Sequence, residues 1–339
     1  MTDEQKLGSG AAPRSRVGPI VWDGAAMLAP MAGVTDVGMR RAASRFGATL
    51  AFSEMVASET FLDGDAECRL RAEGDGVAVH AVQLVGREPA AMGEAARCVE
   101  GAGAAIIDIN MGCPARRVAG ALAGAALMRD LDHAARIIES VAGAVSAPVS
   151  VKMRLGWDDR ERNAPELARR AEGAGAAMVT VHARTRRQFY DGAADWSAVA
   201  EVVAAVGVPV VVNGDCRGLD DARAMLAASG AAAVMIGRAA IGAPWLVGAI
   251  AAALRTGAPY VEPPLEARRE AALAHLDSLL AAMGRRAGLR HARKHLAAYA
   301  EKAGAAPALR AALVTSEDPE AAMALLARAF DPAERKEAA

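Results

Sequence analysis

A short Gly-Ala phrase recurs along the chain, and each copy stands directly before an apolar run. The copies are Gly101-Ala102-Gly103-Ala104, Gly173-Ala174-Gly175-Ala176 and Gly230-Ala231-Ala232. Glycine adopts the left-handed backbone that often ends a helix, so each copy is typical of a turn from a helix into a strand. Repeated turns of this kind predict alternating β/α units around a parallel sheet.

Eight apolar runs of strand length alternate with segments that suit helices. The runs cover residues 25–29, 48–52, 78–84, 105–109, 149–153, 178–181, 208–212 and 232–236, and the clearest helical segments are 89–101, 165–173, 197–206 and 220–228. Eight units within about 240 residues predict a TIM (β/α)8 barrel. A doubly wound open sheet is the alternative, but the first run lacks the GxGxxG turn that such sheets often carry.

A proline-rich segment divides the chain in two. Residues 257–264 read Gly-Ala-Pro-Tyr-Val-Glu-Pro-Pro, which is typical of a linker. The expected organisation is a flexible N-terminal tail over 1–18, the barrel over 19–256, this linker, and a small helical-bundle domain over 265–339. No strand-like run occurs in the last of these segments.

The composition limits the classes of partner and compartment. The formal net charge of the 339 residues is -1, so no global charge draws the chain to a polyanion. The start lacks the apolar core of a signal peptide, and no apolar run reaches membrane-spanning length. We therefore expect a soluble cytoplasmic protein. The four cysteines have neither CxxC nor metal-ligand spacing, which predicts no disulfide framework and no metal site: Cys68, Cys98, Cys113 and Cys216.

Polar, reactive or glycine residues follow nearly every apolar run. TIM barrels concentrate function at the carboxyl ends of their strands, so these residues should converge. Side chains alternate along a strand, which places Ser150, Lys152 and Arg154 on one face and directs Lys152 to the barrel axis. The residues at the strand ends are Pro30, Met31, Glu54, Gln83, Asn110, Lys152, Arg154, His182, Arg184, Asn213, Asp215, Gly237 and Arg238.

Asn110-Met111-Gly112-Cys113-Pro114 places a thiol on a loop directly behind an apolar run. Gly112 allows unusual backbone angles and Pro114 fixes the exit of the loop, so the thiol should be presented rather than packed. An unperturbed thiol has a pKa of about 8.5 and is mostly protonated at neutral pH, so it can act as a general acid. The alternative is a tight turn with an incidental thiol.

Two glycine turns stand at the ends of the seventh and eighth runs. These are Asn213-Gly214-Asp215 and Gly237-Arg238. The corresponding loops form the common phosphate site of TIM barrels, where backbone N–H groups approach the anion and arginine neutralises it. The pattern favours a phosphate site over two ordinary turns.

Lys152 suits a position beside an electron-rich cofactor ring, where a positive charge stabilises the reduced, anionic form. Gln83 would offer its amide to the same ring. The alternative for Lys152 is an ion pair across the barrel with Asp108 or Glu54. His182 stays open between a phosphate contact, a proton carrier and a packed core residue.

Taken together, these motifs and several further segments resemble the tRNA-dihydrouridine synthases. The segment His291-Ala292-Arg293-Lys294-His295 is most similar to the bacterial B-type branch of that family. Order and spacing hold from about residue 19 to the C-terminus. The matching segments are Leu28-Ala29-Pro30-Met31-Ala32-Gly33-Val34-Thr35-Asp36, Ser53-Glu54-Met55, residues 110–118, Lys152-Met153-Arg154, Val181-His182-Ala183-Arg184-Thr185-Arg186, Asn213-Gly214-Asp215, Gly237-Arg238-Ala239, Pro244-Trp245 and His291-Ala292-Arg293-Lys294-His295.

The resemblance implies an FMN-containing barrel that uses NADPH to reduce the C5–C6 bond of a uridine in the tRNA D-loop. Hydride would pass from flavin N5 to C6 of the uracil, and Cys113 would protonate C5, with Asn110 positioning the base. The implied cofactor residues are Pro30, Met31 and Ala32 against the flavin ring, Gln83 and Lys152 at its polar edge, and His182, Asn213, Gly214, Asp215, Gly237 and Arg238 around the ribityl-phosphate.

A flipped D-loop uridine costs a few kcal/mol of unstacking, which contacts to the rest of the tRNA must offset. Because the net charge is -1, local cations must supply those contacts. Residues 279–300 contain five Lys/Arg and no acid, which favours an RNA face over an ordinary solvated helix face. We expect a monomer that binds tRNA through Arg116, Arg117, Arg184, Arg186, Arg290, Arg293 and Lys294.

Two other functions compete with this interpretation. A dihydroorotate dehydrogenase also pairs an Asn with a loop Cys near FMN, but it gives no reason for a basic helical domain. A tRNA-binding protein that has lost catalysis would have no need of Cys113, Lys152 and the phosphate turns. A test with free dihydroorotate separates the first, and the flavin spectrum of the purified protein separates the second.

Overall fold

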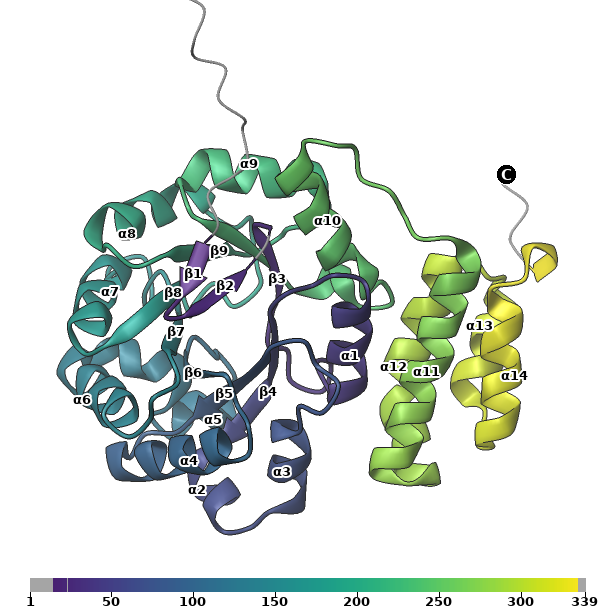
Figure 1. Ribbon diagram of the computed structural model, residues 1–339, viewed down its shortest axis with the longest axis horizontal. Coiled ribbons are helices and arrows are strands. Elements are labelled where there is room, and N and C mark those ends of the chain that lie inside the picture. Colours follow the sequence, from purple (N-terminus) through teal and green to yellow (C-terminus); the bar gives the residue numbers. More distant parts are fainter. Residues whose placement is uncertain (1–14, 23, 335–339) are drawn as a thin grey trace, which may run out of the picture.

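The computed structural model describes residues 15–22 and 24–334, and its centre is a closed barrel of eight parallel strands (Figure 1). Neighbours around the barrel run β10-β3-β4-β5-β6-β7-β8-β9. The strands are β3 (Ala26–Leu28), β4 (Ala51–Ala57), β5 (His80–Val85), β6 (Ile106–Met111), β7 (Val149–Arg154), β8 (Ala176–His182), β9 (Val210–Asn213) and β10 (Ala233–Ile236). All eight expected runs are strands of this barrel, which confirms the TIM-barrel prediction and rules out the open sheet.

Helices follow the strands and cover the outside of the barrel (Figure 1). They are α1 (Val37–Arg45), α2 (Ser58–Leu62), α3 (Ala66–Ala72), α4 (Pro89–Gly101), α5 (Arg116–Gly120), α6 (Leu131–Ala142), α7 (Ala164–Gly173), α8 (Val199–Ala205), α9 (Leu219–Ser229) and α10 (Trp245–Thr256). The outward residues Val151 and Met153 join the core between strands and helices, as the alternation along β7 predicts.

A two-stranded hairpin precedes the barrel, and no sequence pattern indicated it. It pairs β1 (Ser15–Val17) with β2 (Ile20–Trp22) in antiparallel register. Val17 and Trp22 are buried against the apolar residues at the beginnings of the barrel strands, so the hairpin closes that end of the barrel. The expected tail over 1–18 therefore extends too far: the hairpin begins at Ser15, and residues 1–14 lie outside the described part.

The barrel interior changes character along its axis. The part beside the hairpin, where the strands begin, is apolar and contains Met27, Phe52 and Ile106. Farther along the same inward faces come polar side chains, including Asp108 and Ser150, which are register partners on β6 and β7. The apolar part stabilises the barrel, and the polar part faces the end at which the strands finish.

A separate bundle of four helices lies beside α1 and α10 (Figure 1). It consists of α11 (Leu265–Met283), α12 (Arg285–Ala303), α13 (Pro307–Thr315) and α14 (Pro319–Ala329), and it follows an irregular segment over 257–264. Gly38 on α1 lets α11 come close, because a Cβ there would lie 2.8 Å from Cδ2 of His275. Within residues 15–22 and 24–334, no helix is long and apolar enough to cross a membrane.

Candidate active site

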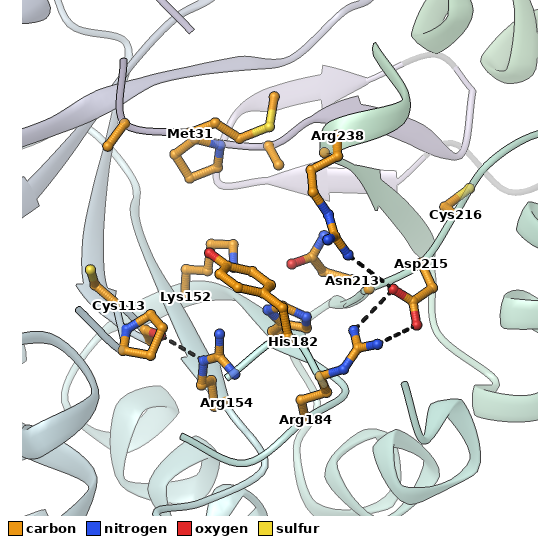
Figure 2. Close-up of a pocket in the computed structure, with 18 of the residues that line it drawn as sticks. Met31, Cys113, Lys152, Arg154, His182, Arg184, Asn213, Asp215, Cys216 and Arg238 are labelled. Carbon is orange, nitrogen blue, oxygen red and sulfur yellow. Dashed lines mark hydrogen bonds and ion pairs between the residues drawn. The ribbon is translucent and has the colours of Figure 1, made fainter. Parts of the chain in front are cut away.

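A cavity of about 1090 Å³ opens at the carboxyl ends of the barrel strands. Every barrel strand, or the loop directly after it, contributes to the lining, and Figure 2 shows Cys113 and Arg238 on opposite sides. The sequence-predicted residues that the cavity brings together are Pro30, Met31, Ala32, Gln83, Asn110, Cys113, Lys152, His182, Arg184, Asn213, Gly214, Asp215, Gly237 and Arg238. The convergence expected from the strand ends is confirmed for these side chains.

The Cys113 loop is held by the side chain of Asn110. The Asn110 Oδ1 accepts hydrogen bonds from the backbone N–H of Gly112 at 3.1 Å and of Cys113 at 2.9 Å. The thiol itself is half-buried and borders the cavity. A single amide oxygen therefore fixes the two peptide groups that carry the thiol.

Gly124 supports this loop from behind. Its φ is +58°, and a Cβ there would lie 3.0 Å from the Cys113 carbonyl oxygen and 3.2 Å from the Cys113 Cβ. The next residue, Ala125, donates its N–H to the same carbonyl at 3.1 Å. Only glycine combines this left-handed backbone with so close an approach, so Gly124 helps to fix the position of the Cys113 backbone at the edge of the cavity.

Arg154 connects the Cys113 loop to the loop after β8, a role that the sequence did not indicate. Its Nε donates to the Gly112 carbonyl at 2.8 Å, and its Nη1 donates to the carbonyls of Thr185 and Phe189, both at 2.8 Å. Burial lowers the pKa of this guanidinium to about 10, so it stays charged at neutral pH. One buried cation thus fixes two loops of the cavity wall.

Lys152 faces the cavity from the interior of β7, as expected. Burial and, to a smaller extent, the nearby Arg154 lower its pKa to about 8, whereas Asp108 acts in the opposite direction. The alternative for Lys152 was an ion pair with Asp108 or Glu54, but both carboxylates have other partners. Asp108 accepts hydrogen bonds from Ser150 and Gln83, and Glu54 accepts one from the Gly33 N–H. The lysine therefore keeps its charge available to an occupant of the cavity.

The His182 ring is neutral, and one of its nitrogens makes no hydrogen bond within the described residues. Burial holds its pKa well below the usual value, and the cations Lys152, Arg154, Arg184 and Arg238 add to that effect. Its Nε2 is buried and has no hydrogen-bond partner among the described residues. A buried nitrogen without a partner costs stability, so this one points to a ligand group that the cavity would receive.

Arg184 and Arg238 meet at Asp215 on the far side of the cavity (Figure 2). Arg184 binds the carboxylate with two donors, at 3.0 and 2.6 Å, and also donates to the carbonyls of Asp191 and Gly192. Only 2% of the Arg184 side chain is exposed, compared with 63% for Arg238. The geometry therefore gives Arg184 a structural part rather than the expected RNA contact, and leaves Arg238 able to meet an anion.

Cys216 also lines the cavity, but it is a packed residue. It is buried, and its thiol donates to the Gly218 carbonyl at 3.6 Å. Burial and Asp221 raise the pKa of this thiol to about 12. Cys113 and Cys216 share one cavity, yet only Cys113 is presented on a loop, whereas Cys216 is buried and hydrogen-bonded.

The remaining expected RNA contacts lie in two separate places. Arg116 and Arg117 are exposed on α5, directly after the Cys113 loop, and Arg186 stacks on the Trp157 ring at 4.7 Å. Arg290, Arg293 and Lys294 stand on α12 of the helical bundle, where Arg290 and Lys294 are exposed.

A cluster at the interface between barrel and bundle has the donor types of a metal site. Carboxylate and ring nitrogen atoms of Asp36, His291 and His295 lie within 4.8 Å of one another. However, the Asp36 carboxylate already accepts from the Met39 N–H at 3.0 Å and faces Nε2 of His275 at 3.0 Å. These contacts make the cluster a connection between α1 and the bundle, with α1 capped by the same carboxylate.

The fold and this site define a class: a (β/α)8-barrel protein that carries a thiol loop and, across the cavity, an exposed arginine beside two glycine turns at the strand ends, extended by a helical bundle. The sequence profile of the family described as "Dihydrouridine synthase (Dus)" matches residues 27–334. The chain belongs to the dihydrouridine synthase family. This confirms the resemblance derived from the motifs.

Similar curated proteins agree with that assignment. A "Probable tRNA-dihydrouridine synthase" of Rhodobacter capsulatus is 53% identical over 76% of this chain and 81% of its own length. A "tRNA-dihydrouridine synthase B" of Xanthomonas campestris is 45% identical over 80% of this chain and 82% of its own length.

Among solved structures, the fold is similar to an amine oxidase for 6-hydroxypseudooxynicotine from Pseudomonas geniculata. The TM-score is 0.54 at 12% identity, over 72% of this chain and 49% of that one. A histamine dehydrogenase from Rhizobium gives a TM-score of 0.50 at 14% identity, over 79% of this chain and 47% of that one. At such identities the likeness concerns the barrel fold alone.

Proposed function

We propose that this protein is a cytoplasmic tRNA-dihydrouridine synthase that uses FMN and NADPH to reduce the C5–C6 bond of a D-loop uridine. The observation that carries the proposal is the shared cavity: an anchored thiol, a lysine with an available charge and an arginine beside two glycine turns line one space. Family membership supplies the reaction class, and these side chains supply groups suited to it.

The cavity residues fit FMN. The orphaned His182 Nε2 and the exposed Arg238 offer polar groups to the ribityl-phosphate side. Gly237 leaves the backbone open there, since a Cβ at this position would meet nothing closer than 3.6 Å. Gly214, with a φ of +124°, lies directly against His182, because a Cβ there would be 3.0 Å from the His182 Cδ2. Lys152 and Gln83 would face the polar edge of the ring, with Pro30, Met31 and Ala32 beside it. When bound, FMN supplies the hydride that the uracil C6 accepts.

Asn110 is prepared to orient the uracil. Its Oδ1 is occupied by the two backbone N–H groups of the Cys113 loop, and one N–H of its amide is donated to Gln83. The group left for the substrate is therefore the second amide N–H, which can only donate. Asn110 should bind a carbonyl oxygen of the base and not its ring N–H.

Cys113 is the proposed proton donor. Hydride addition at C6 leaves negative charge on C5 and the adjoining carbonyl, and a proton must arrive at C5 to complete the reduction. The loop presents this thiol at the cavity edge, across the space from Arg238 (Figure 2). Its product is a thiolate, which must be reprotonated before the next turnover.

The rest of the tRNA would lie over two groups of cations. The first lies on segments that follow cavity-lining residues and includes Arg116, Arg117 and Arg186, and the second is Arg290, Arg293 and Lys294 on α12. Because the bundle packs on α1 of the barrel, the two groups of cations are held in a fixed arrangement. Contacts between tRNA and the bundle would then offset the cost of unstacking the target base in the cavity.

The test is reduction of tRNA that lacks dihydrouridine. Purified protein should be yellow, and with NADPH it should convert one D-loop uridine in such tRNA to dihydrouridine, measured by mass spectrometry of the digested nucleosides. Free uridine and free dihydroorotate serve as controls. Turnover of dihydroorotate without turnover of tRNA would overturn the assignment, as would tRNA binding by a protein that retains no flavin.

A further inference from the structure

Three buried side chains form a chain of hydrogen bonds that ends at the Cys113 loop. The Gln83 Nε2 donates to Oδ2 of Asp108 at 2.6 Å, and the Asn110 Nδ2 donates to Oε1 of Gln83 at 2.8 Å. Asn110 then accepts from the two loop N–H groups with its Oδ1. Asp108 and Gln83 are register partners on β6 and β5, so the first link is fixed by the sheet.

The direction of every bond in this chain depends on Asp108. An Asn or Gln amide presents a donor on one side and an acceptor on the other, and either can rotate by half a turn. An ionised carboxylate has only acceptors. It therefore holds the NH2 of Gln83 toward itself, which turns the Gln83 oxygen to Asn110 and the Asn110 oxygen to the loop. A reversed Gln83 would set two NH2 groups against each other.

Water has little access to repair a reversed amide. The exposed fractions are 1% for Asp108, 1% for Gln83 and 8% for Asn110. The second oxygen of Asp108 is also held, because it accepts from the Ser150 hydroxyl at 2.6 Å. Buried amides with unpaired donors are costly, so one orientation of the chain should dominate.

We propose that Asp108 is a positioning residue that, through Gln83 and Asn110, sets the backbone of the Cys113 loop and leaves one Asn110 N–H for the substrate. The positioning of the loop stands on the geometry alone. Only its consequence for turnover rests on the proposed reduction of uridine.

Hydrogen exchange of the loop amides tests the positioning directly. Asp108→Leu keeps the side-chain size near that of the wild type and removes the acceptor, so the exchange protection of the peptide over residues 110–116 should fall about tenfold. Gln83→Met removes the middle link and should have the same effect. The two variants are alternatives if one of them fails to fold. In both, single-turnover reduction of tRNA should fall on the order of 10- to 100-fold.

A double substitution provides the rescue. In Asp108→Asn combined with Gln83→Glu, the amide introduced on β6 donates to the carboxylate introduced on β5. That carboxylate still accepts from Asn110, so every bond of the chain is kept, and loop protection should return to within about threefold of the wild type. Thr180→Val is the matched control, because the buried Thr180 hydroxyl has no hydrogen-bond partner among the described residues; it should leave the loop unchanged.

Two results would overturn the proposal. One is unchanged loop protection in both Asp108→Leu and Gln83→Met, and the other is a double variant as poorly protected as these two. Exchange is measured without tRNA or NADPH. If the loop protection is lost and rescued in these variants but the wild type reduces no uridine, the proposed function is refuted and the positioning role remains intact.

Discussion

Asp36 and Asp108 are both buried aspartates, yet their environments act on them in opposite directions. Asp36 lies at the interface between the barrel and the helical bundle, and Asp108 lies inside the barrel below the Cys113 loop. The pKa of Asp36 is well below its usual value, whereas that of Asp108 is raised to about 6. Burial alone would raise both, so their partners make the difference.

The partners of Asp36 favour its charge. Burial raises its pKa, but His275 and His295 more than offset this through charge and hydrogen bonds, and Asp36 also caps the N-terminus of α1. Asp108 has only neutral donors, Ser150 and Gln83, and a weaker influence of Lys152, so burial prevails. Hydrogen bonds from neutral groups thus orient the Asp108 carboxylate, but they do not lower its pKa enough to offset the effect of burial.

The first test removes the interface carboxylate. Asp36→Ala leaves His275 and His295 facing an empty position and uncaps α1, so the free energy of unfolding should fall by about 3–5 kcal/mol. Asp318→Ala is the matched control: Asp318 caps α14 through the Ala321 N–H at 2.9 Å and is 60% exposed, so its loss should cost about 1 kcal/mol. Urea unfolding measures both. Equal costs would mean that Asp36 is no more than a helix cap.

The second test uses pH. The folded pKa of Asp108, about 6, lies above the unfolded value, so its stabilisation is complete below about pH 4 and is lost as the pH rises through 6. Relative to Asp108→Asn, the wild type should lose roughly 2 kcal/mol between pH 4 and pH 7. Asp36 has the opposite sign: its stabilisation is present above about pH 4 and is lost as the pH falls further.

Urea unfolding of wild type, Asp108→Asn and Asp36→Asn from about pH 2 to about pH 7 checks both signs. Parallel pH profiles for wild type and Asp108→Asn would show that Asp108 ionises freely despite its burial, and would remove the contrast between the two aspartates.

The third and smallest effect concerns the cations of the bundle. Arg290 is exposed on α12, whereas Arg285 on the same helix is held by Glu320 at 2.6 Å. Arg290→Ala should reduce the slope of log K for tRNA binding against log salt by about 1, and Arg285→Ala should leave it nearly unchanged. Lys294 contacts the interface near Glu54, so its substitution should change the slope less than that of Arg290. Binding titrations at several salt concentrations measure these slopes, and an unchanged slope for Arg290→Ala would place the RNA face elsewhere.

Much of the barrel could be predicted from the sequence because its signals are local. Each strand is a short apolar run, and each helix-to-strand turn carries its own glycine, so neighbouring residues suffice. The same holds for the strand ends, since alternation along β7 places Lys152 inward. The hairpin β1–β2 was missed because strands of three residues are too short to show a period.

The electrostatic partners could not be predicted, because they meet only in the folded chain. Asp36 and His275 are separated by 239 positions, and no local pattern connects them. The stretch on α12 contains no acidic residue, but an acidic residue of another helix pairs with it, because Glu320 on α14 accepts a hydrogen bond from Arg285. Arg184 was expected to bind tRNA for the same reason: its charge was visible in the sequence, but its bonds to Asp215 and to the carbonyls of Asp191 and Gly192 were not.

The central claim is that the Cys113 thiol protonates a uridine reduced within this cavity. The most direct measurement is single-turnover reduction of unmodified tRNA by reduced, flavin-loaded protein, with Cys113→Ala compared with wild type and with Cys216→Ala, which removes the packed thiol of the same cavity. We predict unchanged flavin content in all three, a normal rate for Cys216→Ala, and a rate reduced about 10²- to 10⁴-fold for Cys113→Ala. A normal rate for Cys113→Ala would contradict the claim.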